Sequence, residues 1–98
     1  MNDQFAVLLQ RRLKARSSSS GEEREIVIEV GQPYRVGNDG DAACPVAIRG
    51  LFGRLADIHG VDTMDALRLA IDFVEKVLRG KTGEFEFLWP DGTSYFEN

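Results

Sequence analysis

The clearest alternation of hydrophobic and polar residues lies in the segment 24–30. Its apolar positions are Ile26, Ile28 and Val30, and the acidic positions between them are Glu25 and Glu29. Successive side chains of a strand point to opposite faces, so this spacing predicts a strand with one buried and one solvated face. Only Val27 interrupts the pattern.

Residues 9–16 alternate in a similar way, with apolar residues at odd positions between charged ones. This predicts a strand that pairs back on residues 24–30 as the first arm of a hairpin. The serine-rich segment 17–23 between them has nothing to bury and is expected to be a flexible loop. A helix is the alternative, because four apolar residues also fit helical spacing: Phe5, Leu8, Leu9 and Leu13.

Residues 63–79 carry the strongest helical signals. Asp62 offers an N-capping carboxylate, Asp65 lies in the first turn, and Gly80 follows the last turn. One apolar stripe consists of Met64, Leu67, Ile71, Val74 and Leu78, and a second consists of Ala66, Ala70, Phe73 and Val77. A helix with so wide an apolar face is expected to lie on a sheet.

The remaining segments predict loops and short strands. Residues 32–41 are rich in Gly, Pro, Asn and Asp and indicate a loop. We expect a third strand at Cys44–Arg49, a turn at Gly50–Gly53 and a fourth strand at Arg54–His59. Near the end of the chain, residues 84–89 and 93–97 flank a Pro-Asp-Gly turn.

This terminal pattern predicts a hairpin in which Trp89 pairs with Thr93 and Tyr95 lies across from Phe87, giving an aromatic contact between strands. Together the elements predict one α+β domain spanning residues 1–98. An antiparallel sheet of about four to six strands would carry the 63–79 helix on one face.

Composition limits the classes of function. Of the 98 residues, 43% are hydrophobic, enough for one core, and the formal net charge is -4, which disfavours nucleic acid as a partner. The single cysteine and the absence of a signal-peptide or membrane-spanning pattern predict a cytoplasmic protein without a membrane partner. We expect no cofactor and no metal site.

Two groups of charged or reactive residues are candidates for chemistry. If Arg49 pairs with Arg54, the same register brings Cys44 opposite His59, with Asp57 on the same side to orient the imidazole. Such a group would suit a small thiol-dependent enzyme. A Cys before a Pro in an apolar strand is more commonly a buried hydrophobe, so we expect no catalytic residue.

The basic residues Arg12, Lys14 and Arg16 would share one side of the first strand and are candidates for binding an anion or nucleic acid. Neutralisation by Glu25 and Glu29 on the next strand is the expected alternative. Trp89, beside the terminal turn, is a candidate anchor for a partner, although packing in the core is the expected role of the terminal aromatic residues.

The segments Gly31–Tyr34, Cys44–Pro45, Ile48–Leu51 and Gly60–Ala70 resemble, taken together, a family of small uncharacterised bacterial proteins, a domain of unknown function. The resemblance implies a small bacterial cytosolic domain. Some proteins of this kind are immunity proteins that neutralise toxins, or accessory partners. We therefore expect a noncatalytic protein-interaction domain whose partner is another protein, and an open sheet edge would allow either a homodimer or the addition of a peptide strand.

Overall fold

A long β-hairpin forms the centre of the computed structural model, which describes residues 4–38 and 40–96. Strands β1 (Val7–Ser17) and β2 (Glu23–Gly31) run antiparallel along most of their length. Leu13 lies opposite Ile26, and both side chains are buried. The strand predicted for residues 9–16 is confirmed, and the helical alternative is wrong. The alternating pattern prevails because it buries Leu13 and Ala15 in the core.

The hairpin turn is tighter than the loop predicted at 17–23, since Ser17 belongs to β1 and Glu23 to β2. The Ser17 amide donates to the Glu22 carbonyl at 2.8 Å, which closes the turn. Gly21 has a φ of 76°, a left-handed conformation that glycine adopts without steric cost.

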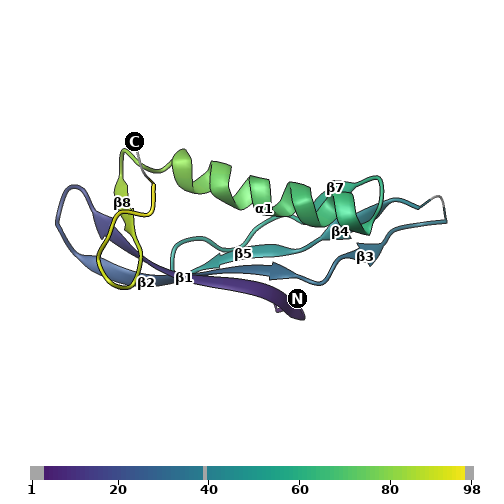
Figure 1. Cartoon of the computed structure of the whole chain (residues 1–98), viewed down its shortest axis with the longest axis horizontal. Coiled ribbons are helices and arrows are strands. Elements are labelled where there is room, and N and C mark those ends of the chain that lie inside the picture. Colours follow the sequence, from purple (N-terminus) through teal and green to yellow (C-terminus); the bar gives the residue numbers. More distant parts are fainter. Residues whose placement is uncertain (1–3, 39, 97–98) are drawn as a thin grey trace.

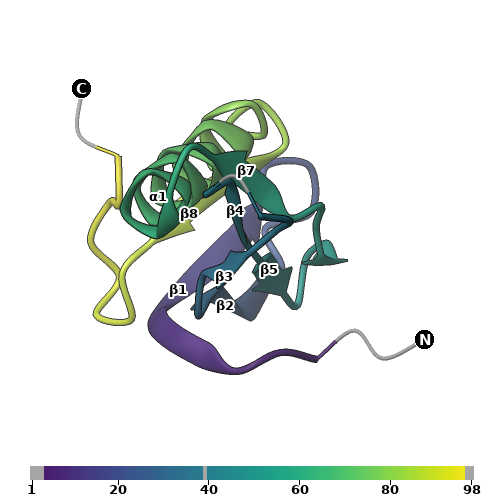
Figure 2. The ribbon, with the colours of Figure 1, turned by 90° about the vertical axis from the view of Figure 1, so that its right-hand side faces the viewer.

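A five-stranded antiparallel sheet is built around this hairpin in the order β6-β5-β2-β1-β8. The added strands are β5 (Val46–Arg49), β6 (Gly53–Arg54) and β8 (Phe85–Leu88). The single described helix, α1 (Thr63–Arg79), lies along one face of the sheet (Figures 1 and 2). The predicted α+β class, an antiparallel sheet with one long helix on one face, is confirmed.

A smaller three-stranded sheet lies at the end of the molecule where α1 begins (Figure 1). Its order is β3-β4-β7, with β3 (Tyr34–Arg35), β4 (Ala42–Cys44) and β7 (Ile58–Gly60). β3 lies inside the segment 32–41 that was predicted to be a loop. Asp39 of that segment is outside the described residues.

The predicted continuous strand Cys44–Arg49 is wrong, because the chain changes sheets at Pro45. β4 ends before Pro45 and β5 begins after it. Proline has no N–H to donate to a ladder. The Pro45 carbonyl accepts from the Gly31 amide at 2.8 Å, and this bond holds the break against the end of β2.

The predicted strand Arg54–His59 is also wrong and is divided in the same manner. Arg54 belongs to β6 in the larger sheet, whereas His59 belongs to β7 in the smaller one. Between them, Asp57 turns its carboxylate back to Arg54 at 2.8 Å. This local ion pair spans the segment that joins the two strands.

Helix α1 has the predicted bounds and the predicted N-cap. The Asp62 carboxylate accepts from the Asp65 amide at 2.8 Å, and the Asp65 carboxylate accepts from the Val61 amide at 3.0 Å. The first bond satisfies a helix amide that an uncapped helix leaves without a partner, and the second ties the residue before the cap to the first turn. Gly80 follows the helix in a right-handed conformation, with a φ of -67°.

The buried row of α1 differs from the expected stripes. It consists of residues four apart: Ala66, Ala70, Val74 and Leu78. Met64 and Ile71, which were expected on the buried face, are 79% and 39% exposed. Gly60 lets the first turn of the helix approach the sheet closely, since a Cβ on Gly60 would lie 2.5 Å from the Ala66 nitrogen.

The predicted terminal hairpin forms, with Trp89 bonded to Thr93 and Tyr95 bonded to Phe87. The Trp89 amide donates to the Thr93 carbonyl at 2.8 Å, and the Tyr95 amide donates to the Phe87 carbonyl at 2.9 Å. The rings pack differently from the expectation, because Phe87 meets Phe96 at 6.2 Å and Tyr95 meets Trp89 at 5.0 Å. The end of the expected return arm, Glu97, lies outside the described residues.

We expect Leu78→Ala to lower the free energy of unfolding by about 2–5 kcal/mol, because Leu78 is fully buried in the last turn of α1. Met64→Ala on the same helix is the control. It should change stability by less than about 0.5 kcal/mol, since Met64 is 79% exposed. Urea denaturation followed by circular dichroism measures both values, and equal losses would contradict this burial pattern.

Candidate functional site

The structure does not bring Cys44 and His59 opposite each other. Cys44 pairs with Ile58, and His59 pairs with Ala43. The predicted register is wrong because it counted outward from an Arg49–Arg54 pair. Arg54 instead lies opposite Ala47 in the five-stranded sheet, whereas Cys44 and His59 belong to the three-stranded sheet. A shift of one residue reverses the face of a side chain. Cys44 is accordingly buried, and His59 is exposed.

The thiol of Cys44 has an environment that disfavours the thiolate. Its Sγ donates to the Gly31 carbonyl at 3.3 Å and is enclosed in the core. Burial, and secondly the negative charge of Asp57, raise the pKa of Cys44 to about 11. Nucleophilic cysteines have a lowered pKa and some exposure, so this cysteine has the features of a structural residue.

Asp57 holds two strands together and has partners other than an imidazole. Tyr34 of β3 donates its hydroxyl to one carboxylate oxygen, and Arg54 of β6 donates to the other at 2.8 Å. Burial alone would raise the pKa of Asp57, but the hydrogen bonds from Tyr34 and Arg54 outweigh it and lower this pKa. The ionised carboxylate therefore links the small sheet to the large one.

Three basic residues of β1 lie on the sheet face away from α1 and have acidic neighbours: Arg12, Lys14 and Arg16. Arg12 binds Glu25 at 3.2 Å. Arg16 binds Glu23 at 2.9 Å and Glu86 at 3.0 Å. Lys14 lies opposite Glu25 in the β1–β2 ladder.

Glu29, which was expected to neutralise this basic row, binds Arg49 of β5 at 3.0 Å instead. The pairing of Glu25 with Arg12 agrees with the expectation. The outer face is therefore a mixed field of charges, whereas a phosphate-binding surface would present a continuous basic patch.

Trp89 lies in an aromatic cluster at the end of β8. Its ring packs against Tyr95, and the guanidinium of Arg11 lies 5.2 Å from its centroid. Trp89 is half-buried and contacts the core. Its large contact area is thus used mainly within the domain, which leaves little of it for a partner.

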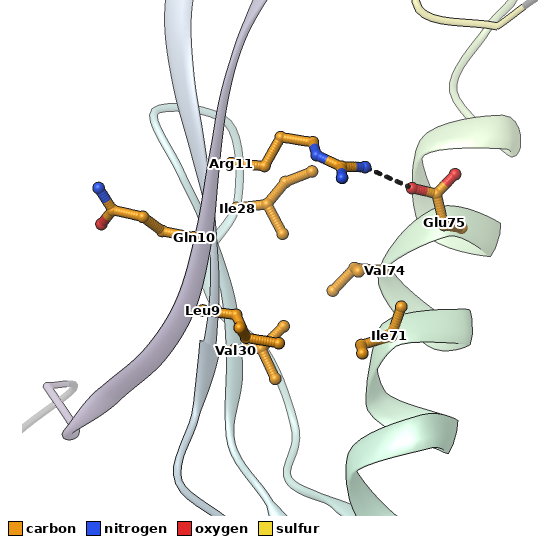
Figure 3. A pocket seen from close by; sticks show the side chains of 8 residues that line it. All are labelled: Leu9, Gln10, Arg11, Ile28, Val30, Ile71, Val74 and Glu75. Atoms are coloured by element: carbon orange, nitrogen blue, oxygen red, sulfur yellow. Dashed lines mark ion pairs between the residues drawn. The ribbon is translucent and has the colours of Figure 1, made fainter.

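An apolar groove opens between the hairpin and the middle of α1 (Figure 3). Its volume is about 200 Å³. Its lining comes from three elements: Leu9, Gln10 and Arg11 of β1, Ile28 and Val30 of β2, and Ile71, Val74 and Glu75 of α1. Leu9 and Ile71 face each other across it, and they are 46% and 39% exposed.

A polar cluster closes one end of the groove. The Arg11 guanidinium lies 4.0 Å from a Glu75 carboxylate oxygen (Figure 3) and donates to the Tyr95 hydroxyl at 2.9 Å. The Tyr95 hydroxyl donates in turn to Glu75. Burial and this bond to Glu75 raise the pKa of Tyr95. The cluster fixes the terminal segment against both β1 and α1.

Beside the groove, one edge of β1 carries no strand. β8 pairs only with Lys14–Ser17. Within residues 4–38 and 40–96, no other strand pairs with β1 on that side, so the edge from Val7 to Leu13 is open. A β-bulge interrupts the β1–β2 register between Val7 and Leu9.

Sequence reasoning missed this groove, although it predicted both elements that form it. Leu9 was assigned to the buried side of a strand and Ile71 to a buried stripe, and the two residues are half-exposed. One signal was available in the sequence: the predicted helix has more apolar residues than the single row that the core buries, so some of them had to remain exposed. Where the helix lies over the sheet, and hence which residues remain uncovered, depends on tertiary packing.

Two absences concern residues 4–38 and 40–96. No group of His, Cys, Asp or Glu side chains in this part of the chain is arranged to hold a metal ion. Among the same residues, no helix has the length and apolar character needed to span a membrane.

Comparison with known families finds a match. The model of a family described as a domain of unknown function, DUF6968, matches residues 9–95. Comparison with curated proteins and with solved structures found no match. The match covers the hairpin from Leu9 onward, the other strands and α1, and it includes all the residues that line the groove.

We expect iodoacetamide to modify Cys44 slowly near neutral pH, because the folded thiol is buried and its pKa is raised to about 11. Mass spectrometry of the intact protein over time gives the rate, and the urea-unfolded chain gives the rate of a free thiol. His59→Ala should leave the rate unchanged. A fast reaction that this substitution slows would support the thiol-dependent enzyme instead.

The same pKa difference predicts a loss of stability at high pH. The folded pKa of Cys44, about 11, exceeds the ordinary value of 9.0, so its contribution is complete below pH 9 and declines as the pH rises toward 11. We expect the free energy of unfolding to fall less steeply over this range in Cys44→Ala than in the unmodified protein. Parallel slopes in urea denaturation would contradict the assignment.

Proposed function

The chain belongs to the DUF6968 family, a domain of unknown function, and we propose that it is a noncatalytic protein-interaction domain that binds an extended segment of a partner protein along β1. The observation that carries this proposal is the open edge of β1 from Val7 to Leu13 directly beside an apolar groove. Strand addition combines these two features, since backbone hydrogen bonds give affinity and side-chain pockets give specificity.

β8 is an internal example of a strand at this edge. It pairs antiparallel with Lys14–Ser17, and Phe87, opposite Ala15, contributes a buried side chain to the core. A partner segment would take the next positions along the same line, opposite Val7–Leu13. Backbone groups of an exposed edge strand are ready to pair with such a segment.

The groove accepts a side chain from the added strand. Every second residue of that strand would point toward α1, into the space between Leu9 and Ile71 (Figure 3). A volume of about 200 Å³ exceeds the ~150 Å³ of an apolar cavity that binds benzene. One large apolar side chain therefore fits, and burying it would remove the half-exposed surfaces of Leu9 and Ile71 from water.

The environments of the reactive residues support a noncatalytic role. Cys44 is buried as a neutral thiol, and Asp57 is held by Tyr34 and Arg54. Recognition of one protein through a strand edge suits the immunity-like or accessory role that the family resemblance suggested. Nucleic-acid binding has weaker support, because Arg12 and Arg16 already bind carboxylates.

The test uses peptides about ten residues long, which are selected from a random display library against the folded domain. We expect the selected peptides to shift the backbone amide resonances of Val7–Leu13. Ile71→Glu should weaken their binding about tenfold or more, because it places a carboxylate in the apolar groove.

Met64→Glu introduces the same charge on the same helix at a side chain that is 79% exposed and outside the groove lining. It should leave the affinity unchanged. A library that yields no binding peptide would contradict the proposal. Selected peptides that tolerate Ile71→Glu, or that shift only amides elsewhere, would contradict it as well.

A further inference from the structure

We infer, resting on the proposed function, that the β1 edge selects an antiparallel partner segment with an acidic residue opposite Arg12 and an apolar residue three positions later, opposite Leu9. β8 establishes a charge pattern along β1, with a carboxylate opposite a basic residue. The direction of each β1 side chain decides which face the partner's side chains share.

Arg16 shows what this edge accepts when a strand occupies it. Glu23 of β2 binds Arg16 from one side at 2.9 Å, and Glu86 of β8 binds it from the other at 3.0 Å. Glu86 lies directly opposite Arg16 in the β1–β8 ladder. The domain itself therefore places a carboxylate opposite a basic residue of β1 on the sheet face away from α1.

Arg12 lies four residues before Arg16, on the same face of β1, and has one of the two carboxylate contacts. Glu25 of β2, which lies opposite Lys14, binds Arg12 diagonally at 3.2 Å. On the open side, the part of the chain that the structure describes supplies Arg12 with no second carboxylate, and its side chain is 58% exposed. A carboxylate at the corresponding position of an added strand would complete the pattern seen at Arg16.

The ladder geometry fixes where the apolar residue falls. In an antiparallel pair, the partner residue opposite Arg12 is followed by residues opposite Arg11, Gln10 and Leu9 in turn. Gln10 points away from α1, whereas Leu9 points into the groove (Figure 3). The third residue after the acidic one therefore shares the face of Leu9 and enters the groove.

Charge also distinguishes this occupant from a second copy of the chain. Between Val7 and Leu13, β1 carries Arg11 and Arg12 and no acidic residue. Antiparallel pairing of two such edges would add no carboxylate to those that Glu75 and Glu25 already supply, and it would bring positive charges close together, which is unfavourable. A segment of different sequence, with its own acidic residue, matches this edge better.

The test compares two synthetic peptides about eight residues long, a usual strand length. One contains Glu followed three positions later by Leu, and the other has Lys in place of Glu. We expect the Glu peptide to bind about two- to fivefold more tightly, as measured by fluorescence polarisation. Arg12→Glu should reverse this preference, and Arg35→Glu is the matched control, because Arg35 is an exposed arginine on the edge strand β3.

The amide resonances of Val7–Leu13 separate this inference from the proposed function. If both peptides shift these resonances but bind equally, or if Arg12→Glu leaves the preference unchanged, the charge rule is overturned and strand addition stands. If neither peptide binds, the sequence rule is overturned, and the library selection then decides the function. If sedimentation equilibrium shows a dimer through this edge, the occupant is a second copy and the inference is wrong.

Discussion

The close approach of α1 to β7 determines the arrangement on which the rest of the structure depends. A Cβ on Gly60 would lie 2.5 Å from the Ala66 nitrogen, so the helix can lie this near only because residue 60 is a glycine. α1 makes most of its contacts with β7 and β4. At its other end, Phe96 packs against Phe87 and below Arg79. The helix is packed against the rest of the domain at both ends. Between its middle and β1 the groove remains open.

The elements that the sequence predicted well are those whose signals are local. The bounds of α1 follow from the Asp62 cap and the following glycine, and the strand at 24–30 follows from its alternation. The division into two sheets was missed because Pro45 interrupts a segment that is otherwise apolar throughout. Once that strand was treated as continuous, the register that joined Cys44 to His59 was wrong by one residue.

The candidate site was missed for a different physical reason. Leu9 and Ile71 belong to patterns that correctly predict a strand and a helix, and nothing in those patterns shows that both side chains stay half-exposed. Their exposure depends on the short β8, which covers only the last four residues of β1, and on the position of α1. The charges near the edge and the bulge beside Leu9 also limit unselective strand pairing. The open backbone, the apolar groove and the nearby arginines are the three features that support the proposed strand addition.

Amide hydrogen exchange in the free domain tests the central claim most directly, because it reports whether the edge of β1 is uncovered before any partner is added. The amides of Lys14–Ser17 lie between two strands and should be protected throughout. In Val7–Leu13, amides that point to the open side should exchange rapidly, in alternation with protected amides bonded to β2. Uniform protection of Val7–Leu13 in a monomeric sample would show that the edge is already covered and would contradict the account.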